Sequence, residues 1–171
     1  NLLAGHSCIT LKALSNGDLV GGTSVSAPGG GHATVTESEL FILDWKTKSI
    51  SYHAPPVPGE TNIVSIEVAG DLVFGLTSGA HFFVFNASSR EIVHREHVSD
   101  LGSVPRHAFQ KSPDNVLYAV CSKQIVRVNT ETFEHESLGV PPKPVTAGGA
   151  WVDGKLFFAC GPTVWSFNIP E

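Results

Sequence analysis

The sequence lacks methionine, has only three cysteines and contains few charged residues. Charged side chains make up 16% of the 171 residues, and the eleven Lys and Arg are scattered singly in a chain of net charge −5. A general nucleic-acid binder needs clustered cations to neutralise phosphates, so this composition excludes that class of partner. No apolar run approaches the roughly 20 residues that cross a bilayer, which argues against a membrane partner.

The missing methionine indicates that the chain is part of a longer gene product, and the cysteines and a glycosylation pattern indicate its chemical environment. Because the chain starts at Asn1 and contains no Met, we expect a further segment to precede Asn1 in the gene. The cysteines have no metal-ligand spacing and are interpreted as small strand residues; they are Cys8, Cys121 and Cys160. Asn86-Ala87-Ser88 fits the N-glycosylation acceptor pattern, so we expect glycosylation at Asn86 and a secreted, extracellular protein.

The 3.6-residue apolar period of an α-helix is also absent, and a pattern of short strands and turns repeats four times instead. The 17 Gly and 11 Pro supply the turns. A two-residue turn and the strand after it align without gaps in four segments, at residues 17–22, 70–75, 114–119 and 154–159. The spacing between copies is in the roughly 40 to 50 residue range of propeller blades.

A third strand follows in every copy, and each ends on Asp or Asn. These residues are Asp44, Asn86, Asn129 and Asn168. In the first three copies a Thr or Ser follows, so the Asx side chain can accept backbone hydrogen bonds and close a hairpin into a fourth strand. The sequence therefore predicts an all-β propeller segment of about four four-stranded antiparallel blades over residues 1–171, with blades at approximately 6–56, 61–98, 106–140 and 145–170.

The repeated pattern of an apolar strand, a Gly-Asp turn, an "LVFGL" or "LFFAC" strand and an "FFVFN-ASSRE" hairpin resembles β-propellers of the quinoprotein-like and YVTN-like type. The last unit stops after its third strand. The resemblance implies the C-terminal half of a seven- or eight-bladed ring, whose partner is the missing N-terminal half or a second chain. The alternative is a four-bladed ring closed by a strand around Leu2 and Leu3.

In propellers the connections between blades lie on the same face as those between second and third strands, and ligands usually bind there. That rule places six polar residues on one face, namely His6, Thr61, Asn62, Arg106, His107 and Thr146. The same face receives the one long insertion, residues 26–34. Long loops in compact domains are often functional, so we expect His32 to contact a ligand together with Thr61, Asn62 and Thr146.

His6, His107 and Arg106 have the chemistry to act on an acidic polysaccharide. A histidine can remove the proton beside a uronate carboxyl group, and an arginine can neutralise the charge that develops. By resemblance to secreted propeller polysaccharide lyases at the level of the fold, we expect a carbohydrate-active protein with catalytic His107, Arg106 and His6. The alternative is a non-catalytic propeller that binds a glycan or a protein on its loop face. No metal or cofactor is expected, because the Trp stack and adjacent Cys pair of a quinone enzyme are missing.

Overall fold

The computed structural model describes residues 3–26 and 32–170, and its regular elements are almost all β-strands. The first sheet contains β1 (Ser7–Ala13), β2 (Leu19–Ser24), β3 (Leu40–Asp44) and β4 (Ser49–Ala54). The second contains β5 (Ile63–Ala69), β6 (Leu72–Thr77), β7 (His81–Asn86) and β8 (Glu91–His97). A short 3₁₀ helix, η2 (Ser99–Leu101), leads to the third sheet of β9 (Phe109–Lys111), β10 (Leu117–Val120), β11 (Ile125–Val128) and β12 (His135–Gly139). The fourth has three strands, β13 (Ala147–Val152), β14 (Lys155–Cys160) and β15 (Thr163–Asn168).

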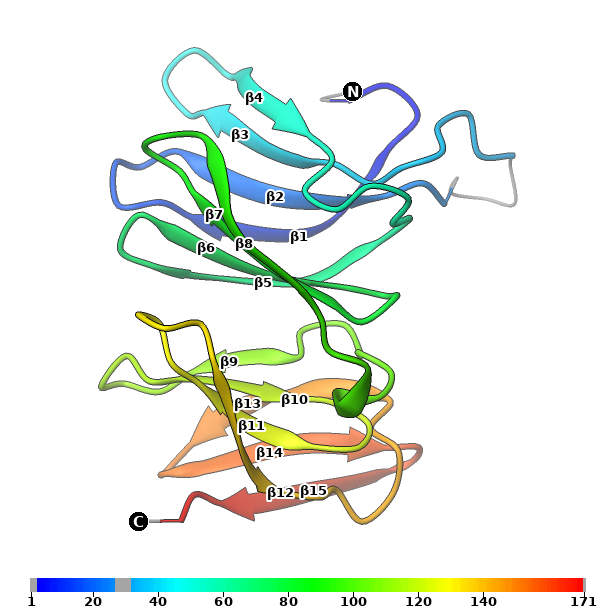
Figure 1. The fold of residues 1–171 in the computed structure, drawn as a ribbon, viewed down its shortest axis with the longest axis vertical. Helices are drawn as coiled ribbons and strands as arrows, with labels where there is room; N and C mark the ends of the chain where they lie inside the picture. The colour runs from blue at the N-terminus through cyan, green and yellow to red at the C-terminus, as the bar shows by residue number, and fades with distance from the viewer. Residues whose placement is uncertain (1–2, 27–31, 171) are drawn as a thin grey trace.

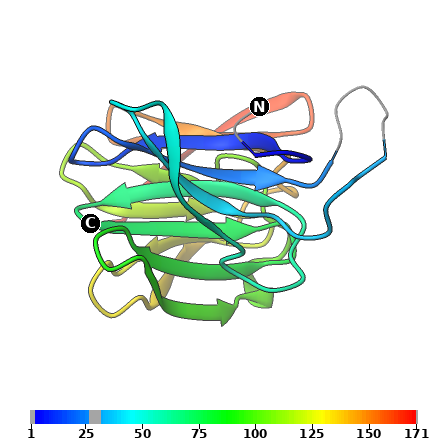
Figure 2. The same ribbon diagram turned by 90° about the horizontal axis from the view of Figure 1, so that it is seen from above.

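The four sheets are arranged as the blades of a β-propeller, which confirms the predicted fold class. Every strand is antiparallel to its neighbour, and the sheets follow one another in chain order along the long axis of Figure 1. The first strand of each blade is the inner one, since β1 packs beside β5, β5 beside β9, and β9 beside β13. Figure 2 shows most strands of the successive blades lying along a common axis, with arrows that point in both directions.

The fourth blade ends at β15, which pairs with β14 alone in the described part of the chain. Leu3 does not supply the missing strand, because its carbonyl accepts the backbone N–H of His6 in a turn, while Leu2 lies outside the described residues. No helix among the described residues is long and apolar enough to cross a membrane.

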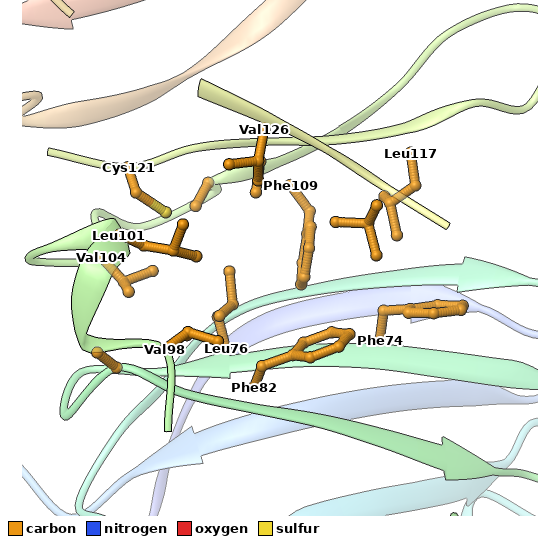
Figure 3. Close-up of a cluster of buried hydrophobic side chains, with 14 of the residues drawn as sticks. Phe74, Leu76, Phe82, Val98, Leu101, Val104, Phe109, Leu117, Cys121 and Val126 are labelled. Carbon is orange, nitrogen blue, oxygen red and sulfur yellow. The ribbon is translucent and has the colours of Figure 1, made fainter. Parts of the chain in front are cut away.

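Apolar side chains from facing sheets hold neighbouring blades together. Figure 3 shows the cluster between the second and third blades, in which Phe74, Leu76 and Phe82 pack against Phe109 and Leu117. Similar clusters join the first blade to the second and the third to the fourth. Because both faces of the middle blades are buried, burial of apolar area between sheets is the main favourable term in this fold.

The repeat was aligned by sequence without gaps through the second strands, but the pairing of second with third strands differs by one residue between blades. Leu19 pairs with Leu43 and Leu156 with Phe167, whereas Leu72 pairs with Asn86. Since side chains alternate between the faces of a strand, a slip of one residue exchanges those faces. Val20 and Val73, which the alignment makes equivalent, therefore meet in the core between the first two blades.

The hairpin that closes the outer edge of each complete blade forms as predicted. The Asp44 carboxylate accepts the backbone N–H groups of Lys46 and Thr47 at 2.8 and 2.9 Å. Asn86 and Asn129 accept the equivalent pairs of N–H groups at 2.8 to 3.0 Å. These Asx turns satisfy backbone donors that the strand ladder leaves free, and so each one fixes where the fourth strand begins.

We expect the Asp44 turn to make stability depend on pH in the acid range. The backbone N–H of Thr47, followed by that of Lys46, holds the pKa of this carboxyl below its usual 3.8. A carboxyl whose pKa is lowered on folding stabilises the folded state above its unfolded pKa, and this contribution is lost as the pH falls through the folded pKa.

The measurement is the thermal unfolding midpoint, followed by circular dichroism at several pH values below about 4, where aspartate titrates. Asp44→Asn keeps the acceptor oxygen but does not titrate, so its midpoint should fall less steeply with acid than that of the native chain. Parallel curves for the two proteins would contradict the role given to Asp44.

Candidate axial binding site

Residues from the inner strands of all four blades line a cavity of about 230 Å³. Its wall is formed by residues of β1, β5, β9 and β13 and by His107, two positions before β9. The lining residues are Thr10, Leu11, Lys12, Ser65, Ile66, His107, Phe109, Gln110 and Gly149. Polar groups that are distant in sequence therefore face one space on the axis of the propeller, which is where a ligand could contact several blades at once.

A larger hollow of about 580 Å³ lies along β10, β11 and β12 of the third blade alone. Its most prominent charges already pair with each other, since Arg127 Nη2 lies 2.6 Å from Glu136 Oε2. A ligand there would have to compete with this ion pair. The axial cavity, with contributions from four blades, is the better candidate for a binding site.

A cluster of three charges joins the inner strands beside this cavity. Lys12 Nζ lies 2.6 Å from Glu67 Oε2, and Lys111 Nζ lies 3.9 Å from Glu67 Oε1. The Glu67 side chain is only 9% exposed, and the two lysine ammonium groups are its ion-pair partners. Two cations against one anion leave the axis locally positive within a chain whose net charge is −5.

The backbone around His107 is held by the blades on either side. Its N–H donates to the carbonyl of Val64, and the carbonyl of Arg106 accepts the N–H of Gly148 at 3.0 Å. His107 adopts a left-handed conformation with φ 59°, an uncommon one for histidine. His107 is one of the residues that line the cavity, and its exposed imidazole makes no hydrogen bond within residues 3–26 and 32–170, while Gln110 Nε2 donates to its backbone carbonyl.

The other residues predicted for the site serve mainly local structure. The His6 ring bonds to the carbonyls of Ala4 and Glu37. Asn62 bonds to Ser24, Thr61 and Ser78, and Thr146 bonds to Ala159 and Gly161. These contacts tie the connections together on one side of the blades, at the right of Figure 1.

Arg106 is exposed beside His107, whereas His6 is not joined to either of them by a hydrogen bond or ion pair among the described residues. His32 is exposed, and the predicted insertion at 26–34 falls in part on residues 27–31, outside the described ranges. Of the predicted residues, His107 alone lines the axial cavity.

Sequence reasoning missed the inner-strand residues Lys12, Ser65 and Gln110. A signal was present, because the second and third strands of the blades are almost entirely apolar while the inner strands carry isolated polar residues. Glu67 is the clearest case, because it is the one charged residue of the strand Ile63–Ala69, in which every other residue except Ser65 is apolar. A lone charge in a buried strand predicts a partner from a neighbouring strand.

A metal or thiol chemistry has little support within the described chain. No group of three His, Cys, Asp or Glu is placed to hold a metal there. All three cysteines are free, and burial raises the pKa of Cys121 to about 12, which keeps its thiol protonated.

Glycosylation of Asn86 stays a prediction. The Oδ1 atom of Asn86 accepts a backbone N–H in the turn, and the Ser88 hydroxyl donates to Asp71.

The comparisons with known proteins agree with a propeller fold and go no further. No protein-family model matches the chain, and no curated protein matches its sequence. The crystal structure of Sqt1 from Saccharomyces cerevisiae superposes with a TM-score of 0.70 at 15% identity over 97% of this chain, which spans 46% of the Sqt1 chain. The computationally designed Ika4 protein superposes with a TM-score of 0.64 at 16% identity, covering 99% of this chain and 98% of its own. Identities this low establish the fold alone.

Proposed function

We propose that this chain is a secreted propeller module that binds a carboxylate-bearing polysaccharide or oligosaccharide in the axial cavity. The observation that carries the proposal is the positive balance of Lys12, Glu67 and Lys111 beside a cavity whose lining includes His107. A ligand with a carboxylate gains a charge-assisted hydrogen bond there, and such bonds are stronger than neutral ones.

The lining residues divide between the two parts of a uronate sugar. His107 lines the cavity, and Arg106, which is exposed next to it and outside the lining, is the second donor proposed for the carboxylate. Arg can offer two parallel N–H groups to the two carboxylate oxygens. Gln110 offers its side-chain oxygen to a sugar hydroxyl, while its Nε2 donates to the His107 carbonyl. The hydroxyls of Thr10 and Ser65 are buried and accept the backbone N–H groups of Gly22 and Phe109, so they position the wall and leave ligand contact to Gln110.

The test is isothermal titration calorimetry with an oligogalacturonate, and with a maltooligosaccharide of equal length as the neutral control. We expect binding of the acidic ligand alone. His107→Ala and Arg106→Ala should each weaken binding by about tenfold or more, since a hydrogen bond to a charged group contributes about 1.5–3 kcal/mol.

His53→Ala is the matched control, because His53 is an exposed histidine on β4, away from the cavity. The unfolding midpoints of all three variants should stay near that of the native chain, since exposed loop and edge residues contribute little to stability. Equal binding of the acidic and neutral sugars, or equal effects of the three variants, would overturn the proposal.

A polysaccharide lyase is the second candidate, and the observation that favours it is that His107 lines the cavity and its exposed imidazole makes no hydrogen bond among the described residues. The imidazole would take the proton from the carbon beside the uronate carboxyl while Arg106 neutralises the charge on that carboxyl. The electron pair then forms a C=C bond as the glycosidic C–O bond breaks, and the leaving oligosaccharide takes up a proton. Appearance of the ultraviolet absorbance of the unsaturated product, abolished in His107→Ala, would establish catalysis; its absence with retained binding would leave the non-catalytic module.

A further inference from the structure

Each of the two end blades has one face on which no other blade packs within the described residues. The termini lie at opposite ends of the molecule in Figure 1, and within residues 3–26 and 32–170 no closely packed strand pair joins the first blade to the fourth. Leu11 is 50% exposed on the free face of the first blade. Val152 and Val164 are 47% and 71% exposed on the free face of the fourth. Aliphatic side chains gathered at the ends of a stack of sheets indicate an interaction surface.

The free face of the first blade repeats a row of residues that is buried elsewhere in the same molecule. Four paired positions cross the second blade, where Ile66, Gly75, Phe83 and Arg95 face the first blade. The same register crosses the first blade through Leu11, Gly21, Phe41 and His53.

In both rows a phenylalanine ring lies directly over a glycine. A Cβ added to Gly21 would lie 2.3 Å from Phe41, and a Cβ added to Gly75 would lie 2.0 Å from Phe83. Leu11 is 50% exposed, compared with 3% for Ile66, whereas Phe41 is 1% exposed and is as buried as Phe83. The free face of the first blade is therefore of the kind that packs against a preceding blade.

The free face of the fourth blade is of the complementary kind, which packs against a following blade. Phe157 pairs with Ser166 in the register in which Val20 pairs with Ile42 and Phe74 with Val84. Val20, Ile42, Phe74 and Val84 are at most 4% exposed, because a following blade covers each pair. Nothing covers the equivalent face of the fourth blade among the described residues, and Phe157 is only partly buried there.

We infer that two copies of this chain pack head to tail, with the first blade of each copy against the fourth blade of the other, into a closed eight-bladed ring. A second copy offers both kinds of face at once, and a twofold axis uses each interface twice and leaves no free end. The superposition on less than half of the Sqt1 chain is compatible with four blades forming part of a longer ring. This inference does not depend on the proposed ligand.

The test is the mass in solution of the native chain, by light scattering after size exclusion and by native mass spectrometry. We expect twice the chain mass of 18.2 kDa. Leu11→Asp and Val164→Asp each place an unpaired carboxylate in both interfaces and should raise the dimer Kd by at least about 100-fold, because desolvating an unpaired charge is costly. Val140→Asp is the matched control, since Val140 is 74% exposed in the connection before β13 and should remain a dimer.

Mixing the two variants separates a head-to-tail ring from a symmetric face-to-face dimer. In the mixture, the native first blade of Val164→Asp can pack on the native fourth blade of Leu11→Asp, so one undamaged interface returns and dimer should reappear. A native chain that is monomeric at about 100 µM, above the Kd of a typical specific complex, would overturn the inference. So would a third polypeptide in the complex, an open series of larger oligomers, or a mixture that stays monomeric.

Discussion

Phe83→Ala is expected to lower the free energy of unfolding by about 3–5 kcal/mol, the usual cost of removing a fully buried aromatic ring. Phe83 has 0% exposure in the core between the first two blades. Its ring also covers Gly75, so that truncation opens space on the blade as well as between blades. Since domain stabilities are about 5–15 kcal/mol, this single change removes a large part of the total.

The loss is measured by urea unfolding followed by circular dichroism, with two control variants. Phe83→Leu keeps most of the volume and should cost less than half as much, because the residual cavity is smaller. Val140→Ala removes methyl groups that are 74% exposed and should change stability by less than about 0.5 kcal/mol. A loss below about 1 kcal/mol for Phe83→Ala would show that packing between these blades is looser than described.

Gly148→Ala is expected to separate the third and fourth blades and to damage the axial site. A Cβ at this position would be 2.0 Å from the carbonyl oxygen of His107 and 2.6 Å from that of Arg106. Both contacts are with backbone, which cannot swing aside as a long side chain can. Relief requires movement of β13 away from the start of β9, at a cost of about 2–3 kcal/mol, typical of overpacking.

Because Gly148 holds the backbone of both proposed ligand contacts, the variant should also bind the oligogalacturonate at least about tenfold more weakly, as expected for the loss of one good hydrogen bond. Ala147→Ser, on the neighbouring exposed position of β13, is the control and should leave both quantities unchanged. Native stability and native affinity in Gly148→Ala would contradict the close approach of the two blades.

The fold could be predicted from the sequence because its signals are local. Gly-Asp turns, Asx residues at the ends of third strands and a steady repeat each constrain a few neighbouring residues, and the hairpins at Asp44, Asn86 and Asn129 form as these signals indicate. The side on which each strand residue points could not be predicted. Runs such as Leu72–Thr77 are apolar on both faces because both are buried, and so no alternation identifies the face or the register.

The site was harder to predict, since its residues converge only after the blades are placed. Connections with His6, Asn62 and Thr146 attracted attention because polar loops often bind ligands, yet their side chains bond mainly to neighbouring segments. Lys12 and Glu67 are 55 positions apart and meet through the packing of inner strands. Only His107, which belongs both to a connection and to the wall of the cavity, could be found from its position between two blades.

The register slip between second strands has a consequence for how this chain can change in evolution. The inner hairpin turn occupies residues 14–18 in the first blade and only residues 70–71 in the second. Nevertheless Leu43 and Phe85 hold the same place before the Asx residue of the third strand. Insertions and deletions are therefore absorbed at the tip of the inner hairpin and do not shift the outer strands. Blades of this kind can gain or lose residues there singly, so descendants of one ancestral unit can diverge in length as well as in sequence while their packing surfaces stay aligned.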